Sequence, residues 1–540
     1  MKSDHSTINF HETNGYSDPI LEFISTVLMD EDMKSKICTS VDLLALQAAE
    51  KYFYEALVDK NSSTHNQIPQ NLQHPYPNDR ELLKGKNSHS RSEDFEVEQG
   101  RSNKLVASFA DETVLSETFD RVLLCLGETD AKSNLQLDVH GGKSGRRRQR
   151  RKSEESMDPS ALLIQCAQAV AAYDRASAAE LLMQIRQYAS PCGNGPRRLA
   201  FYFADALEAR LAGTGAQHCA LSFSNGLAAN DFLAAYHLYQ LVCPFDNILF
   251  LFNRMVIMDL AAKASKLHIV HFGILYGFRW PLVIQHLSKI RGGPPTLRIT
   301  GIEFPQPGFK PAQRVEETGQ RLAHYCKRFN VPFEYNGIAR NWESIQIKDL
   351  KLESDEVLIV VCTNRLRNLP DETVVPAESN PRDKVLKLIK KMNPRIFIHG
   401  VINGAFNSPF FVARFREVLF HFSPLFDMFD TIVPGHNKER MFIEREIFGR
   451  EIMNVVASEG ADRVERPETY KQWQIRNQRA GLNQMPLDKK IIEKLKAKVR
   501  QEYHKEFLIT QDGEWMLQGW KGRVTFAVSC WNADRDNEHK

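Results

Sequence analysis

The sequence predicts an α/β protein in which a mostly parallel sheet is covered on both faces by helices. From residue 264 onward, short apolar runs of strand length alternate with longer amphipathic stretches. Such alternation is typical of parallel sheets with helical connections. Residues 158–263 are rich in Leu and Ala at helical spacing, which predicts a helical cap ahead of the sheet. Residues 1–157 are mainly polar and predict a largely disordered N-terminal arm.

The arm is dominated by polar residues between positions 61 and 104, which cannot bury enough apolar surface to offset the entropy of ordering. Apolar islands lie at residues 18–32, 40–57 and 119–126, and the first of them mixes acids with large apolar residues. Such islands are typical of activation or docking segments that fold on a partner. Transient helices without a dedicated partner would have the same composition, and the sequence leaves both interpretations open.

A basic run ends the arm. Six of seven consecutive residues are cationic: Arg146, Arg147, Arg148, Arg150, Arg151 and Lys152. The flanking glycines and serines predict an accessible segment that an acidic receptor groove could bind, so we expect a nuclear localisation signal. A non-specific phosphate-binding patch and a solvated linker are the alternatives.

The cap begins at Asp158, where a capping acid and Pro159 precede an apolar run. Helical spacing then predicts further helices at residues 175–189, 197–211, 232–241 and 249–263. Residues 238–260 form the most hydrophobic stretch of the chain. Asp246, Asn247, Asn253 and Arg254 interrupt this stretch, so we do not expect it to cross a membrane.

The α/β core is expected over residues 264–532, with a short tail at 533–540. The apolar runs predict strands at residues 267–272, 296–302, 331–335, 357–362 and 395–402. Helices are predicted at residues 280–290, 314–329, 382–391, 409–421 and 489–503. Two C-terminal runs at 515–520 and 523–531 predict an antiparallel hairpin. A parallel sheet that ends in such a hairpin is the layout of methyltransferase-like folds, an analogy that fixes no activity.

The turn after the first strand is a candidate cofactor site. Gly273 and Gly277 lie between that strand and a helix, where glycines let a nucleotide approach the backbone. Glu303 follows the next strand, where an acid could bind ribose hydroxyls. The full dinucleotide glycine pattern is absent, and glycines are also common at tight strand-to-helix turns. We therefore expect no cofactor, and keep a small-molecule-binding or S-adenosylmethionine-dependent methyltransferase domain as the alternative function.

Composition excludes several classes of protein. A net charge of +3 is too small to indicate nucleic-acid or membrane binding over the whole surface. The nine cysteines include no Cys-x-x-Cys pair and favour a reducing compartment over a disulfide framework or a zinc site. No nucleophile-elbow or His-x-x-x-His pattern occurs, so we expect neither an enzyme nor a metal site.

Five ordered blocks resemble the GRAS family of plant regulators. Leu267, His268, Ile269, Val270 and His271 are similar to its Val-His-Ile-Ile-Asp signature. Residues 162–189 and 232–263 resemble its leucine-rich regions. Residues 409–417 resemble its Pro-Phe-Tyr-Arg-Glu region, and 463–466 match its Arg-Val-Glu-Arg element. Residues 515–531 fit its Ser-Ala-Trp region, and the acidic arm resembles the Scarecrow-like subgroup.

This resemblance implies a Rossmann-like core under a helical cap and a nuclear transcription regulator that acts through protein partners. The implied partners are DNA-binding factors, including the bZIP type, the transcription machinery and other GRAS chains as dimers. The leucine-rich helices would carry these contacts, with Leu162, Leu163, Leu181 and Leu182 as candidates. Sequence-specific DNA contact by the chain itself stays open. A basic stretch, Arg463, Arg466, Lys471, Arg476 and Arg479, could meet phosphates or could form internal ion pairs.

One departure from the family concerns the acid that ends the signature strand, which His271 replaces here. A histidine cannot act as an acceptor-only group as a carboxylate does. We therefore expect His271 to be a core residue with one local hydrogen bond.

Overall fold

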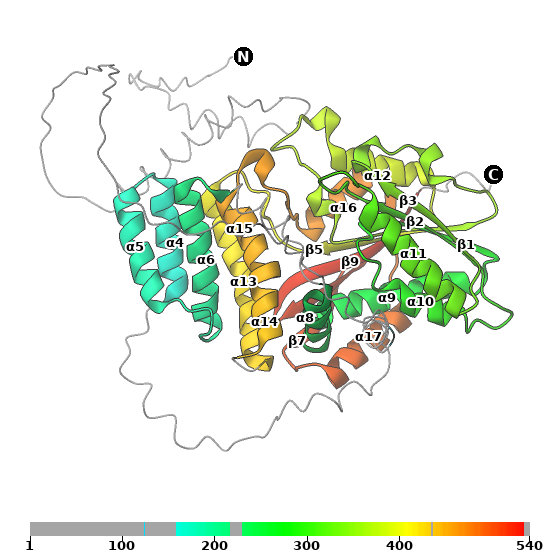
Figure 1. Ribbon diagram of the computed structural model, residues 1–540, viewed down its shortest axis with the longest axis horizontal. Helices are drawn as coiled ribbons and strands as arrows, with labels where there is room; N and C mark the ends of the chain where they lie inside the picture. Colours follow the sequence, from blue (N-terminus) through cyan, green and yellow to red (C-terminus); the bar gives the residue numbers. More distant parts are fainter. Residues whose placement is uncertain (1–123, 125–157, 216–228, 434–435, 534–540) are drawn as a thin grey trace, which may run out of the picture.

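The computed structural model describes Leu124 and residues 158–215, 229–433 and 436–533 (Figure 1). The basic run at residues 146–152 and nearly all of the three apolar islands lie outside the described residues. The tail beyond residue 533 also lies outside them. The predicted α/β class is confirmed: helices cover a nine-stranded mixed sheet, and a helical bundle stands beside one end of it.

The helical bundle combines segments from both halves of the chain. It contains α4 (Pro159–Ala171), α5 (Arg175–Tyr188), α6 (Gly195–Ala212), α13 (Phe411–Ile432) and α15 (Arg450–Ala457). The Asp158 carboxylate caps α4 by accepting a hydrogen bond from the Ser160 N–H at 2.9 Å, as its position predicted. The helical bundle therefore extends beyond the cap expected at residues 158–263, because α13 and α15 also belong to it. Because α13 is buried along much of its length, it packs into the bundle as a central helix.

Two apolar helices link the bundle to the sheet. They are α8 (Ala229–Val242) and α9 (Pro244–Ala261). In the part of the chain that the structure describes, no single helix is long and apolar enough to cross a membrane. The α8–α9 pair reaches that length and composition but is bent by 83°. Much of α9 is buried against the sheet, so its apolar side chains form part of the hydrophobic core.

The strands follow the order β3-β2-β1-β4-β5-β9-β8-β7. Five parallel strands form one part: β1 (Lys266–Phe272), β2 (Thr296–Glu303), β3 (Phe333–Ala339), β4 (Val357–Thr363) and β5 (Ile396–Ile402). Their connections contain α10 (Trp280–Leu287), α11 (Gln313–Arg328) and α12 (Pro381–Met392). Short 3-10 helices occur at Trp342–Ser344, Ile347–Leu350, Leu366–Asn368, Ala377–Ser379 and Gly460–Asp462.

The antiparallel part confirms the predicted hairpin and adds two strands that the sequence did not reveal. The hairpin consists of β8 (Trp515–Trp520) and β9 (Arg523–Ala533), and β9 pairs with β5. The additional strands are β6 (Leu482–Met485) and β7 (Phe507–Asp512), which are short or partly exposed. The remaining helices are α14 (Lys438–Ile443), a π-helical turn at Glu444–Gly449, α16 (Tyr470–Arg479) and α17 (Lys489–Glu502).

Strand alternation divides the signature strand between two apolar cores. Leu267 and Ile269 face the larger core, which α9 and α10 also join, whereas Val270 and Phe272 face the opposite core under α12. His271 follows the first group by the same alternation, and its side chain contacts Trp280 of α10. Strand alternation therefore places His271, which replaces the acid of the family signature, on the sheet face that α9 and α10 cover.

A fully buried ion cluster joins α6 to the π-helical turn. The Glu444 carboxylate accepts a hydrogen bond from Arg198 at 3.0 Å and another from Arg440 at 2.6 Å. All three residues are almost completely inaccessible to solvent. Buried charges of this kind are tolerated only when they are paired, so each partner depends on the others.

Changing Glu444 to Gln should lower the free energy of unfolding by about 3 kcal/mol, because Arg440 and Arg198 would both lose a buried carboxylate partner, although Arg198 keeps its ion pair with Asp430. The exposed Arg445→Gln variant is the matched control and should change it by less than about 0.5 kcal/mol. Urea unfolding of both variants measures the difference. Equal small effects would show that the cluster does not carry the expected energy.

Candidate functional site

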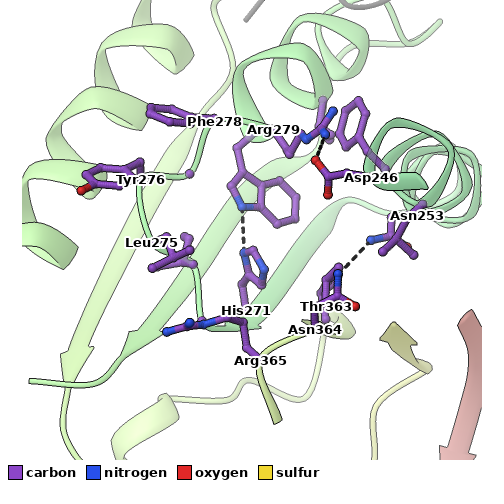
Figure 2. A pocket seen from close by; sticks show the side chains of 18 of the residues that line it. Asp246, Asn253, His271, Leu275, Tyr276, Phe278, Arg279, Thr363, Asn364 and Arg365 are labelled. Atoms are coloured by element: carbon purple, nitrogen blue, oxygen red, sulfur yellow. Dashed lines mark hydrogen bonds and ion pairs between the residues drawn. The ribbon is translucent and has the colours of Figure 1, made fainter. Parts of the chain in front are cut away.

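A cavity of about 330 Å³ lies at the carboxyl ends of β1 and β4, beneath α8 and α9 (Figure 2). Strands β1 and β4 are neighbours in the sheet, but the chain continues from β1 to β2 on one side and from β4 to β5 on the other. Ligands of open α/β sheets bind at this kind of position. The described part of the chain contains no cluster of residues arranged to hold a metal ion.

The cavity wall is largely apolar and aromatic, with several polar groups among these side chains. The apolar and aromatic residues are Tyr236, Leu249, Phe250, Ile257, Ile274, Leu275, Tyr276, Phe278, Trp280, Val283 and Val361. The polar or charged residues are Asp246, Asn253, Arg254, His271, Arg279, Thr363, Asn364, Arg365 and Arg367. A mainly apolar pocket with a few convergent polar groups is the usual form of a small-molecule site.

The turn that carries the cofactor candidates is held by the protein's own groups. Glu303 is buried, and its carboxylate accepts hydrogen bonds from the N–H groups of Leu275 and Phe304, both at 3.0 Å. Arg365 also donates to this carboxylate at 3.1 Å. Glu303 is therefore already engaged in fixing the turn, and its position does not support the predicted role of binding ribose hydroxyls.

The two glycines have packing reasons of their own. Gly273 has a φ of +78°, and a β-carbon there would lie 2.5 Å from Cγ of Arg365. A β-carbon at Gly277 would lie 2.9 Å from the Thr318 methyl group. The close backbone approach that the sequence suggested for a cofactor is thus made by Arg365, whose side chain lies beside His271 in Figure 2.

His271 accepts a hydrogen bond at Nδ1 from the Trp280 indole N–H at 3.0 Å (Figure 2). Because an indole nitrogen only donates, Nδ1 must be unprotonated, and the neutral ring carries its hydrogen on Nε2. Burial, and to a lesser extent the nearby Arg365 guanidinium, lowers the pKa of His271 to about 3. The single local hydrogen bond agrees with our expectation, but the residue also lines the cavity.

Charged groups on the wall are mostly paired. Arg279 forms an ion pair with Asp246 and lies over the Phe250 ring at 4.9 Å. Arg367 pairs with Glu451 at 2.9 Å and with Glu465 at 3.3 Å. Asn253 donates to the Thr363 hydroxyl at 3.4 Å, while its own carbonyl oxygen has no partner within the described chain.

The rest of the signature strand has a structural role. Leu267, Ile269 and Val270 are completely buried. His268 is buried as well, with its ring nitrogens 2.6 Å from a Glu356 oxygen and 2.8 Å from the Thr300 hydroxyl. These contacts connect β1 with β2 and with the segment that leads into β4.

The candidate leucines of the cap are core residues rather than surface contacts. Leu163 and Leu182 are 1% and 7% exposed, and Leu162 and Leu181 are partly buried against the same core. Leu163 and Leu182 therefore pack inside the cap and offer little surface to a partner, because helical spacing identifies an apolar face without telling which element covers it. The exposed apolar side chains here are Tyr173, at 69%, and Met183, at 60%.

The basic stretch at 463–479 mainly forms internal contacts. Arg463 and Arg466 are 3% and 2% exposed. Arg476 pairs with Glu468 at 2.7 Å and with Glu372 at 2.6 Å, and Lys471 pairs with Asp512 at 2.5 Å. These contacts favour the internal-network alternative over phosphate binding, with Arg479 left at the surface.

Most of the cavity residues were not among the site residues predicted from the sequence, including several of its polar side chains. Asn253, Arg254, Trp280, Asn364 and Arg365 lie on three separate segments that only the fold brings together. One signal was available, since Asn253 and Arg254 interrupt an otherwise apolar helix. Polar residues inside such a helix indicate a polar surface that the helix contacts.

Comparison with known proteins agrees with this capped α/β architecture. A GRAS domain family model matches residues 159–532. Scarecrow-like protein 14 of Arabidopsis thaliana is 49% identical over 467 residues, which cover 83% of this chain but only 60% of that protein. Scarecrow-like protein 30 is 44% identical over 523 residues, which cover 95% of this chain and 89% of that protein. Scarecrow-like transcription factor PAT1 is 30% identical over 370 residues, covering 68% and 75% respectively.

A solved structure shows the same fold. The crystal structure of SCL7 from Oryza sativa superposes with a TM-score of 0.59 at 29% identity, covering 70% of this chain and all of that chain. The domain is therefore a capped Rossmann-like domain of the kind found in plant regulators. The chain belongs to the GRAS family, whose Scarecrow-like members are plant transcriptional regulators.

Changing His271 to Asn, which does not titrate, should make unfolding less sensitive to acid. Between about pH 6.5 and the folded-state pKa of about 3, unfolded His271 binds a proton that folded His271 does not. This difference lowers the wild-type free energy of unfolding by up to about 1.4 kcal/mol for each pH unit below 6.5. The variant should gain stability relative to wild type as the pH falls.

Urea unfolding at a series of pH values measures this difference. The exposed His324→Asn variant serves as the control and should parallel the wild type. Parallel curves for the His271 variant would show that His271 titrates normally in the folded protein.

Proposed function

We propose that this protein is a nuclear transcription regulator that acts through protein partners and reaches DNA through DNA-binding factors, including those of the bZIP type. The observation that carries the proposal is the family match across residues 159–532. The charge distribution supports the indirect route to DNA, because Arg463, Arg466 and Arg476 are used in internal contacts.

The geometry of the glycine turn favours regulation over methyl transfer. A methyl-donor cofactor would need the backbone at Gly273 and the carboxylate of Glu303, and these groups contact Arg365 and the loop N–H groups. Binding such a cofactor there would require displacement of a buried ion pair. The turn is therefore best explained as a structural element that shapes the cavity.

Partner binding is assigned here to the exposed face of the cap. Tyr173 lies in the turn between α4 and α5, and Met183 is an exposed residue of α5. Helix α5 is the bundle helix farthest from the sheet (Figure 1). A groove of about 470 Å³ beside Tyr173 also includes Phe410, which is 38% exposed. Exposed aromatic and methionine side chains are characteristic of protein-binding surfaces.

Removing the basic run should abolish nuclear import. Changing Arg146, Arg147, Arg148, Arg150, Arg151 and Lys152 to Ala removes the charge that an acidic import receptor would bind. A fluorescent fusion of the full chain in plant cells should then move from the nucleus to the cytoplasm. The control replaces the exposed Lys489, Lys490 and Lys494 of α17 with Ala and should stay nuclear. Nuclear fluorescence of the arm variant would assign import to another segment.

Polar substitutions on the cap face should reduce transcriptional output without loss of the protein. Tyr173→Asn suits the left-handed backbone at that position, and Met183→Ser removes an exposed apolar side chain. The double variant should lower output from a reporter with a bZIP site by roughly tenfold, the usual effect of removing a central apolar contact. Ile475→Ser on α16, which is 48% exposed, is the control. Unchanged output for the double variant would place the partner surface elsewhere.

A further inference from the structure

In the described chain, one of the arginines that line the cavity between α9 and β1 has no acidic partner. Arg279, Arg365 and Arg367 each have a carboxylate partner: Asp246, Glu303 and Glu451, respectively. Arg254 differs from them. Its guanidinium contacts the neutral ring nitrogen Nε2 of His286 at 2.9 Å, and no carboxylate of the described chain pairs with it. Among the described residues, no acidic group neutralises the positive charge of Arg254 on this wall.

His286 cannot take the place of a counter-ion. Its Nδ1 lies 2.7 Å from the Leu282 carbonyl oxygen, so this nitrogen carries the hydrogen and Nε2 faces Arg254 as an acceptor. Burial lowers the pKa of Arg254, and no acidic group opposes this effect. A half-buried arginine in this setting would gain free energy from an anion that enters the cavity.

Two neutral polar groups on the same wall could also bind a ligand. Trp280 occupies Nδ1 of His271, so the ring hydrogen lies on Nε2. No described residue accepts a hydrogen bond from this Nε2–H. Asn253 is only 9% exposed, and its side-chain carbonyl oxygen has no hydrogen-bond partner in the described chain. Aliphatic and aromatic side chains make up the larger share of the wall, so much of an occupant's surface would meet apolar groups.

We propose that this cavity binds an apolar small molecule that carries one anionic group, such as a monocarboxylate, with the anion at Arg254. The His271 Nε2–H then donates a hydrogen bond to a neutral acceptor or to the anion. The volume of about 330 Å³ suits a compact molecule of two or three rings rather than a dinucleotide. This site goes beyond the proposed regulatory function and does not depend on it.

Two fluorescent probes with a common skeleton test the proposal on the purified full chain. Anilinonaphthalene sulfonate is apolar and anionic, whereas phenylnaphthylamine is the same molecule without the sulfonate. Both probes should bind, and the anionic one should bind roughly tenfold to a hundredfold more tightly, the range expected for a charge-assisted hydrogen bond. Equal affinities for wild type, or no saturable binding of either probe, would overturn the proposal.

Variants at Arg254 localise the anion. Arg254→Met should remove the preference for the sulfonate while phenylnaphthylamine still binds, which also confirms that the cavity is intact. Arg254→Lys should retain most of the preference, and the exposed Arg291→Met should retain all of it. A preference unchanged in Arg254→Met would show that the anion binds elsewhere and would exclude this site. If Arg254→Met does not fold, the wild-type comparison and the lysine variant still decide.

Discussion

Burial of arginine side chains is the constraint on which the fold depends. Arg198, Arg382, Arg414 and Arg440 are among the largest fully buried side chains of the described chain. A guanidinium inside a protein must be met by carboxylates and carbonyls with suitable geometry. Arg414 of α13 meets the Ser408 and Val455 carbonyls, and Arg382 of α12 pairs with Glu468 at 2.9 Å. Val455 and Glu468 are distant in sequence from the arginines that they meet, so these two contacts connect the cap, the connecting helices and the C-terminal segments.

The same constraint explains why the Arg-Val-Glu-Arg element contains two arginines. The Arg-Val-Glu-Arg element provides Arg463, which donates to the Phe406 carbonyl, and Arg466, which contacts Asp371 at 3.3 Å. Its Glu465 pairs with Arg367 beside the cavity. The sequence left open whether this basic element meets phosphates or forms internal ion pairs, and its contacts in the structure are internal.

Much of the fold could be predicted because its elements differ in period and composition. Strand β1 is a continuous apolar run, and Pro159 follows a capping acid, so both were found close to their observed positions. Strands β6 and β7 were missed because β6 is only four residues long and β7 is partly exposed, so neither has a clear apolar period. The turn at Gly273 was located correctly, but the sequence did not reveal that the Arg365 side chain packs against it. Arg365 lies 92 positions further along the chain, and only the pairing of β1 with β4 brings the two together.

The internal bonds of Glu303 have a consequence for the thermodynamics of the cavity. Because this carboxylate already orders the turn at Leu275, an entering molecule would not have to fold a loop. The heat-capacity change on binding would then reflect mainly the apolar surface of the occupant rather than coupled folding of the chain. For the same reason, association would not wait for slow ordering of the backbone, and the rings of Tyr276 and Phe278 on the cavity wall already stack 5.2 Å apart.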